Sequence, residues 1–262
     1  MDFQAIRKEY ENAGLDESDI LADPIEEFRK WMALAQEGSP GRWFEVNAMT
    51  LSTSDVNGNV TSRVVLLKEV RDTGFVFFTN YLSQKGQQIA ANPKVSLAFH
   101  WPYLGRQVRI LGSVTQTTRE VSETYFHSRP RGSQIGAAIS AQSQKVTSRA
   151  ELEQRARELD EKLDGEEAVP CPEHWGGYLV SPSTIEFWQG RLDRIHDRIV
   201  FQSKGGEWGT SSTLSLASRF RLPDRSLPTP SLRNLAVLNN VTVMIMMIII
   251  GMLRLAICLL AI

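Results

Sequence analysis

The chain has 262 residues, of which 42% are hydrophobic and 23% are charged, so it is long enough to bury a substantial core. Its formal net charge of -1 gives no support to wholesale binding of nucleic acid or an anionic membrane, and any anion site must be local. The two cysteines, Cys171 and Cys258, are too few for a disulfide framework, and no Cys/His cluster has zinc-ligand spacing. One domain with extensions, in a reducing compartment, is therefore predicted.

The N-terminal sequence MDFQAIRKEYENAG is charged and lacks the apolar stretch of a secretory signal. It also lacks the features of an obvious transit peptide. We therefore expect a cytoplasmic protein.

The first predicted helix begins at Asp23, where a capping side chain is followed by Pro24 and by the first-turn carboxylate Glu26. Gly38 is its expected end. The apolar positions between them have helical spacing: Ile25, Phe28, Met32 and Ala35.

From Ala48 to Thr118, runs of β-branched and aromatic residues alternate with turn signals, which is typical of antiparallel strands. Asn57-Gly58 lies between two such runs and predicts a hairpin. Ser83 is expected to begin a short helix within this region. The pattern predicts a mainly β fold with flanking helices (α+β), built around a barrel or sandwich.

Two further helices are predicted, at Arg119 to His127 and at Ser148 to Leu163, the second with a capping box of Ser148 and Glu151. Strand patterns return in GGYLVSP, TIEFWQG and DRIVFQS. Another strand should begin at Glu207-Trp208, but its pattern is not continued, and we expect this strand to be missing. Residues 209–240 are predicted to form a flexible linker.

Candidate site residues are scattered cations and hydroxyls, because the sequence has no G-x-G-x-x-G, P-loop or G-x-S-x-G motif. Arg63 and Lys68 lie in a run of Val and Leu, where a charge needs a partner or an anionic ligand. Their odd spacing points them to opposite faces of a regular strand, so one shared pocket requires a bulge or two adjoining sites. The alternative is two surface charges at strand ends.

Lys85 follows the helix start at Ser83, where free backbone N–H groups favour a phosphate. The segment YFHSRPRGSQIG brings Tyr125, Arg129 and Ser133 together, groups that suit a phosphate monoester, and we expect Pro130 and Gly132 to make its backbone irregular. An ordinary polar loop is the competing interpretation.

A third group follows the aromatic Trp188, where Arg194, His196 and Arg198 alternate and so share one side of an extended chain. This cationic face suits a flat anionic ligand. The alternative is a salt-bridged face formed with Asp193 and Asp197.

Taken together and in order, these segments resemble the pyridoxine/pyridoxamine 5′-phosphate oxidase family. The similar blocks are RKEY, SRVVLLK, FFTN-x3-QKG, RQVRILG, YFHSRP-x2-SQIG, the Gln142-Ser143 pair, WGGY and EFWQG-x3-R-x-HDR, between Ile6 and Trp208. The resemblance implies an FMN-binding split β-barrel, a homodimer with FMN at the subunit interface, and no nucleic-acid partner.

The resemblance also implies site residues. FMN would be held by Arg63, Val64, Val65, Leu66, Phe78, Thr79, Gln84, Lys85, Gln107, Gln142, Ser143, Trp188 and Arg198. The substrate phosphate would be held by Lys68, Tyr125, Arg129 and Ser133. The substrate ring would lie against Arg194, Ile195 and His196, with Arg7, Lys8, Glu9 and Tyr10 folding over the site. Arg194 and His196 would be the catalytic residues.

One position departs from the family pattern, because Gln84 stands where arginine is frequent. Losing one guanidinium from a phosphate site would weaken FMN binding by about 1–3 kcal/mol, the usual value of a charged hydrogen bond.

The implied reaction is oxidation of pyridoxine 5′-phosphate or pyridoxamine 5′-phosphate by O2 to pyridoxal 5′-phosphate and H2O2, with NH3 released from the amine. Hydride would pass from the substrate's C4′ carbon to flavin N5, and His196 has an intrinsic pKa suited to proton handling. The rival hypothesis is a catalytically impaired relative that binds FMN or pyridoxal phosphate and lacks the terminal strand.

The last segment, Val241 to Ile262, is apolar, carries the single charge Arg254 and is long enough to span a bilayer. It follows several arginines, as a tail anchor facing the cytosol would require. The alternative is a spurious translation fused where the terminal strand should be. The predicted organisation is residues 1–22 over the active site, 23–208 as the oxidase domain, 209–240 as linker and 241–262 as the apolar segment.

Overall fold

The computed structural model describes residues 14–140, 142–143, 145–163, 168–192, 196–205 and 207–211. The predicted arm of Arg7 to Tyr10, the region beyond Ser211 and the apolar segment of Val241 to Ile262 lie outside the described residues. Within the described ranges, no helix is both long enough and apolar enough to cross a membrane.

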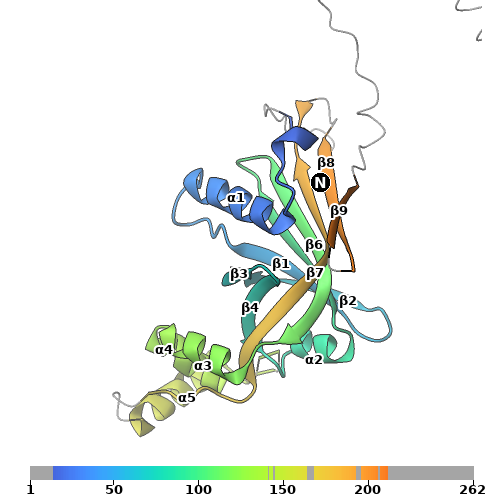
Figure 1. Ribbon diagram of the computed structural model, residues 1–262. Coiled ribbons are helices and arrows are strands. Elements are labelled where there is room, and N and C mark those ends of the chain that lie inside the picture. Colours follow the sequence, from blue (N-terminus) through green and yellow to red (C-terminus); the bar gives the residue numbers. More distant parts are fainter. Residues whose placement is uncertain are drawn as a thin grey trace, which may run out of the picture. The chain divides into compact units, whose positions relative to one another are not determined.

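The dominant element is an antiparallel sheet whose strands follow the order β2-β1-β5-β6-β7-β4-β3, with β8 paired to β7 and β9 paired to β8 (Figure 1). The strands are β1 Ala48–Ser54, β2 Val60–Leu66, β3 Glu69–Arg71, β4 Gly74–Asn80, β5 Lys94–Trp101, β6 Arg106–Gln116, β7 Trp175–Gln189, β8 Asp197–Lys204 and β9 Glu207–Ser211. The predicted mainly β fold is confirmed.

The long strand β7 connects two parts of this sheet. Along one edge it pairs with β6, whereas along the other it pairs first with β4, over residues 175–180, and then with β8, over residues 184–189. A register shift at Leu111 and Gly112 of β6 falls near the change of partner. A bulge of this kind bends the strand and increases the local twist, which curls the sheet.

The helices are η1 Glu17–Asp19, α1 Pro24–Glu37, α2 Gln84–Ala91, α3 Arg119–Ser128, α4 Arg131–Ile139 and α5 Arg149–Lys162. Their starts follow the expected capping chemistry. The Asp23 carboxylate accepts from the Ile25 N–H at 2.7 Å, and the Ser83 and Ser148 hydroxyls accept from Gly86 and Glu151 N–H groups. The predicted hairpin is also present, with Gly58 at φ +82° in the turn between β1 and β2.

Two hydrophobic clusters stabilise this part of the chain. The larger lies between α1 and the sheet, where Phe28 makes edge contacts with Phe75 and Phe99. Trp31, rather than the expected Met32, is fully buried on this helix. The smaller cluster holds α3, α4 and α5 together beside the start of β7, with Phe126 and Trp175 at its centre (Figure 1).

Two expectations about the backbone are wrong. The missing terminal strand is present, because β9 pairs with β8 from Glu207 opposite Lys204 to Ser211 opposite Val200. Residues 209–211 therefore belong to the sheet and not to a linker. The segment around Pro130 and Gly132 is also regular, since α4 begins at Arg131, one residue after proline.

Candidate functional site

A cavity of about 840 Å³ lies where β2, β4 and the start of β7 meet α3 and α4. Most of its lining was predicted: Arg63, Val64, Val65, Leu66, Lys68, Phe78, Thr79, Lys85, Tyr125, Arg129, Ser133 and Gln142. Six further residues were not predicted: Asn80, Pro130, Gly136, Ala137, Ser140 and Trp175. Of these, Trp175 belongs to the WGGY block, the one sequence signal that could have identified it.

Arg63 and Lys68 line the same cavity in spite of their odd spacing. Strand β2 ends at Leu66, and the Lys68 N–H then donates to the Val76 carbonyl at 2.9 Å. Strand alternation therefore no longer applies at Lys68, and no bulge within β2 is needed.

One group of lining residues surrounds the buried ammonium of Lys85, which is 8% exposed. Its Nζ donates to Gln142 Oε1 at 2.7 Å and to the hydroxyls of Thr79 and Ser83 at 3.1 Å each. Burial, with a smaller contribution from the charge of Arg63, lowers the pKa of Lys85 to about 8. Neutral oxygens therefore surround a cation that has no described carboxylate partner.

Arg63 also lines the cavity near Lys85, and its Nη1 donates to Leu51 O at 3.1 Å and Thr53 Oγ1 at 2.7 Å. Burial lowers the pKa of this guanidinium. Two cations beside the start of α2 form a local positive field, and the helix dipole adds to it.

The predicted pair Gln142 and Ser143 contacts the first residues of α2. Ser143 has φ 71°, in the left-handed region that residues other than glycine rarely adopt, and its Oγ accepts from the Gln84 N–H at 3.2 Å. Such strain is commonly found at binding sites. The Gln84 side chain is exposed and does not line the cavity.

A second group of lining residues is aromatic and cationic. The rings of Phe78 and Tyr125 stack at 4.0 Å, and Trp175 lies nearly parallel to Phe78 at 5.6 Å. The Arg129 guanidinium lies 4.9 Å from the Trp175 ring centroid, and burial lowers its pKa. Its Nη1 is buried without a hydrogen-bond partner among the described residues, so this guanidinium has a donor to offer an anion.

The remaining predicted residues form a separate cluster on neighbouring strands. Gln107 of β6 is opposite Trp188 of β7, which is opposite Arg198 of β8. The rings of Trp188 and His196 are 4.8 Å apart. Arg194 and Ile195 lie outside the described residues.

Ion pairs are also present in this cluster, as the salt-bridge alternative supposed, although with different partners. Arg198 pairs with Glu186, and Asp197 pairs with Arg191 at 3.3 Å. The cluster thus combines an aromatic surface with an arginine whose position is fixed by a nearly buried carboxylate.

One chain does not bring these two groups of residues together. Trp175 is the first residue of β7 and lines the cavity, whereas Trp188 lies 188 − 175 = 13 residues further along the same strand. At about 3.3 Å per residue, this is a path of roughly 40 Å along the strand. The cavity and the Trp188 cluster therefore lie at opposite ends of β7.

Two family models match this chain. Residues 42–162 match the family model "Pyridoxamine 5'-phosphate oxidase", and residues 175–212 match "Pyridoxine 5'-phosphate oxidase C-terminal dimerisation region". The second match ends one residue after β9, which supports the presence of that strand.

Among curated proteins, a pyridoxine/pyridoxamine 5′-phosphate oxidase of Rhodopirellula baltica is 52% identical, covering 75% of this chain and 88% of the relative. One of Thermosynechococcus vestitus is 50% identical, covering 78% and 94%. Among solved structures, PhzG from Burkholderia lata, in complex with tetrahydrophenazine-1-carboxylic acid, has a TM-score of 0.72 and 27% identity over 78% of this chain and 98% of that chain. The chain belongs to the pyridoxine/pyridoxamine 5′-phosphate oxidase family.

Proposed function

We propose that this protein is an FMN-dependent oxidase that converts pyridoxine 5′-phosphate or pyridoxamine 5′-phosphate to pyridoxal 5′-phosphate with O2 as acceptor. The observation that carries the proposal is the cavity, whose lining has two cationic groups, one around Lys85 and the other around Arg129 beside stacked aromatic rings. Two stacked ligands, each with a flat ring and a phosphate, need this arrangement. Relatives about 50% identical over most of their length are named for the same activity.

The residues present fit FMN as the cofactor. Lys85, Arg63 and the start of α2 would hold its phosphate, because they supply charge and donors that no described carboxylate neutralises. When bound, FMN supplies the redox chemistry, accepting hydride from the substrate's C4′ carbon and passing electrons to O2, which gives H2O2.

The substrate phosphate would bind to the second group of lining residues: Lys68, Arg129, Tyr125 and Ser133. The buried Nη1 of Arg129 supports this assignment, since a phosphate oxygen would satisfy it. Fixing both phosphates aligns the two rings, and this positioning is the main contribution that the protein makes to the rate.

The second cluster would complete the site from another copy of the chain. The roughly 40 Å of strand along β7 between the two groups supports this arrangement, as does the match to a dimerisation region. In a homodimer, Gln107, Trp188 and Arg198 of one protomer would contact FMN in the cavity of its partner. Arg194 and His196 would then orient the substrate ring and handle its protons.

The rival proposal, an impaired binder without the terminal strand, loses its main argument because β9 is present. The preferred substrate and the cytoplasmic location stay predictions.

Anaerobic mixing of the FMN-loaded protein with pyridoxine 5′-phosphate tests the function. Bleaching of the flavin absorbance near its visible maximum is expected, followed by recovery and H2O2 formation when air is admitted. Unphosphorylated pyridoxine is the matched control and should bleach far more slowly. A flavin that stays oxidised with both phosphorylated substrates would refute the oxidase and leave the binder.

A further inference from the structure

Trp175 lines the cavity and is 6% exposed, yet neither the predicted site residues nor the proposed roles above include it. Its ring lies nearly parallel to Phe78 and Tyr125, with interplanar angles of 14° and 10°. The Phe126 ring makes an edge contact with the Trp175 ring, and the two ring centroids are 5.1 Å apart. The indole is therefore a rigid wall of the cavity.

The guanidinium of Arg129 lies over this indole at 4.9 Å and over Phe126 at 5.9 Å. An aromatic face holds an arginine in place without using any of its N–H donors. These donors are then available for an anion, as the unpaired Nη1 shows within the described chain. The position of Arg129 thus depends on where Trp175 is held.

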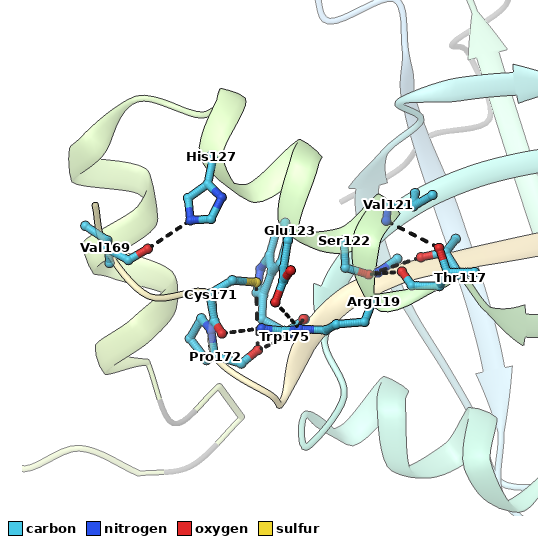
Figure 2. Close-up of polar contacts among 12 residues, drawn as sticks. Thr117, Arg119, Val121, Ser122, Glu123, His127, Val169, Cys171, Pro172 and Trp175 are labelled. Carbon is cyan, nitrogen blue, oxygen red and sulfur yellow. Dashed lines mark hydrogen bonds and ion pairs between the residues drawn. The ribbon is translucent and has the colours of Figure 1, made fainter. Parts of the chain in front are cut away.

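Three contacts hold the backbone of Trp175: its N–H donates to the Pro172 carbonyl at 3.0 Å, it pairs with Asn80 of β4, and its carbonyl accepts from Arg119 at the start of α3 (Figure 2). Its guanidinium donates to the carbonyls of Cys171, Pro172 and Trp175, the last two at 2.9 and 3.3 Å. Its Nε donates to Glu123 one turn along the helix at 2.8 Å. One planar fork therefore closes the turn that leads into β7.

The same helix attaches the chain on both sides of this turn, as Figure 2 shows. His127 contacts the Val169 carbonyl at 3.2 Å, and the Ser122 hydroxyl accepts from the Gly177 N–H at 3.2 Å. Gly177 and Gly176 permit this approach, since a Cβ at Gly176 would lie 2.7 Å from Ser122 Oγ and 2.1 Å from the Tyr81 hydroxyl. Helix α3, which carries Tyr125, therefore also fixes Trp175.

We propose that Trp175 is a substrate-binding residue, which supports Arg129 for the substrate phosphate, and that Arg119 is the positioning residue that fixes Trp175. This inference rests on the proposed function and adds a binding residue and its support to the same site. Loosening the turn at residues 171–175 would tilt the indole and move Arg129, while the FMN phosphate site at Lys85 would be unaffected.

Arg119→Met tests the proposal in the full-length, FMN-loaded protein. The KM for pyridoxine 5′-phosphate should rise roughly tenfold, the effect of about one charged hydrogen bond, while kcat per bound flavin and FMN affinity stay near wild type. Inhibition by inorganic phosphate should weaken by a similar factor. Trp175→Leu should give the same pattern, and Trp175→Phe, which keeps an aromatic face, should restore much of it.

Arg149→Met is the matched control, because Arg149 forms the same i,i+4 ion pair with Glu153, at 2.8 Å, on the exposed helix α5. It should leave KM unchanged. Arg119→Lys keeps the charge without the fork and should be intermediate if Arg119→Met fails to fold.

Equal KM values for the Arg119→Met and Arg149→Met variants would overturn the proposal. A parallel decrease in kcat, FMN affinity and melting temperature at unchanged KM would also overturn it, because that pattern indicates general destabilisation. Failure of the wild-type protein to turn over pyridoxine 5′-phosphate would instead overturn the proposed function, and the two outcomes are distinguishable.

Discussion

Lys85 is a cavity-lining cation whose charge changes with pH close to the physiological range. Burial lowers the pKa of Lys85 to about 8 from an ordinary value of 10.5, so the group is charged below pH 8 and increasingly neutral above it. A bound phosphate raises this pKa again, because it stabilises the charged form. Binding above pH 8 therefore takes up a proton.

We predict that the affinity of the apoprotein for FMN falls above pH 8, by at most about tenfold per pH unit. Lys85→Met should bind FMN more weakly at pH 7 and should lose most of this pH dependence. Quenching of FMN fluorescence between pH 7 and 9.5 measures both effects. Lys94→Met, at an exposed strand end, is the control and should behave as wild type. The same steep decline in Lys85→Met would assign it to another group.

The same pKa affects folding with the opposite sign. Between pH 8 and 10.5 the unfolded chain binds more protons at Lys85 than the folded chain, so this residue's contribution to stability increases as the pH rises. Below pH 8 the folded apoprotein bears the cost of the buried charge. We propose that the charge is retained because it binds the FMN phosphate.

A substitution at Gln84 is expected to increase the affinity for FMN. Gln84 is the first residue of α2, its side chain is exposed, and its backbone N–H already donates to Ser143. Gln84→Arg should strengthen FMN binding by about 1–3 kcal/mol, because it adds one charged hydrogen bond. Gln87→Arg adds the same charge one turn later and should change the affinity little. Equal Kd values for the two variants in a titration of the apoprotein would contradict the prediction.

At the scale of elements, the presence of strand β9 is the largest departure from what the sequence predicted. It pairs with β8 over its whole length, and Trp208 packs against the larger hydrophobic cluster. Without β9, the backbone groups of β8 on that side would be an open edge. The strand therefore protects the element that carries Arg198.

We predict that a chain stopped after Ser211 keeps the stability of the full chain. A chain stopped after Gly205 should lose about 2 kcal/mol, roughly the burial free energy of one large side chain. Urea unfolding monitored by circular dichroism measures the difference. Indistinguishable midpoints for the two shortened chains would mean that β9 contributes nothing.

At the scale of the whole molecule, the separation of the two residue groups along β7 makes the subunit interface testable. Arg129→Met disables the cavity, and Arg198→Met disables the second cluster, so each variant alone should be nearly inactive. In a homodimer with shared sites, a hybrid of the two variants contains one intact site and one doubly altered site. Equal co-expression should therefore recover about a quarter of wild-type activity, because half of the dimers are hybrids with half their sites intact.

Differently tagged copies allow the hybrid to be purified and assayed alone, where half of wild-type activity per dimer is expected. Each variant co-expressed with itself is the control. Recovery of no activity in a purified hybrid would show that each site lies within one chain.

The sequence could predict the elements whose signals are local. Asp23 with Pro24, Ser83, and Asn57-Gly58 act on neighbouring backbone groups, so capping and turn chemistry identified them directly. Helix α4 gave no such signal, since Pro130 has no side-chain capping bond and Gly132 lies within the helix. Strand β9 is short, and its stability depends on β8, so its own sequence pattern was too weak to show it.

The sequence by itself determined the family, the mainly β fold and most of the cavity lining, because these depend on residue types in a fixed order. Only the tertiary structure decided that Arg63 and Lys68 share a cavity, that Trp175 supports Arg129, and that the Trp188 group lies far from both. The physical reason is that these relations depend on where strands end, which strands pair, and how α3 packs on β7. Such contacts join residues distant in the chain, and no local pattern encodes them.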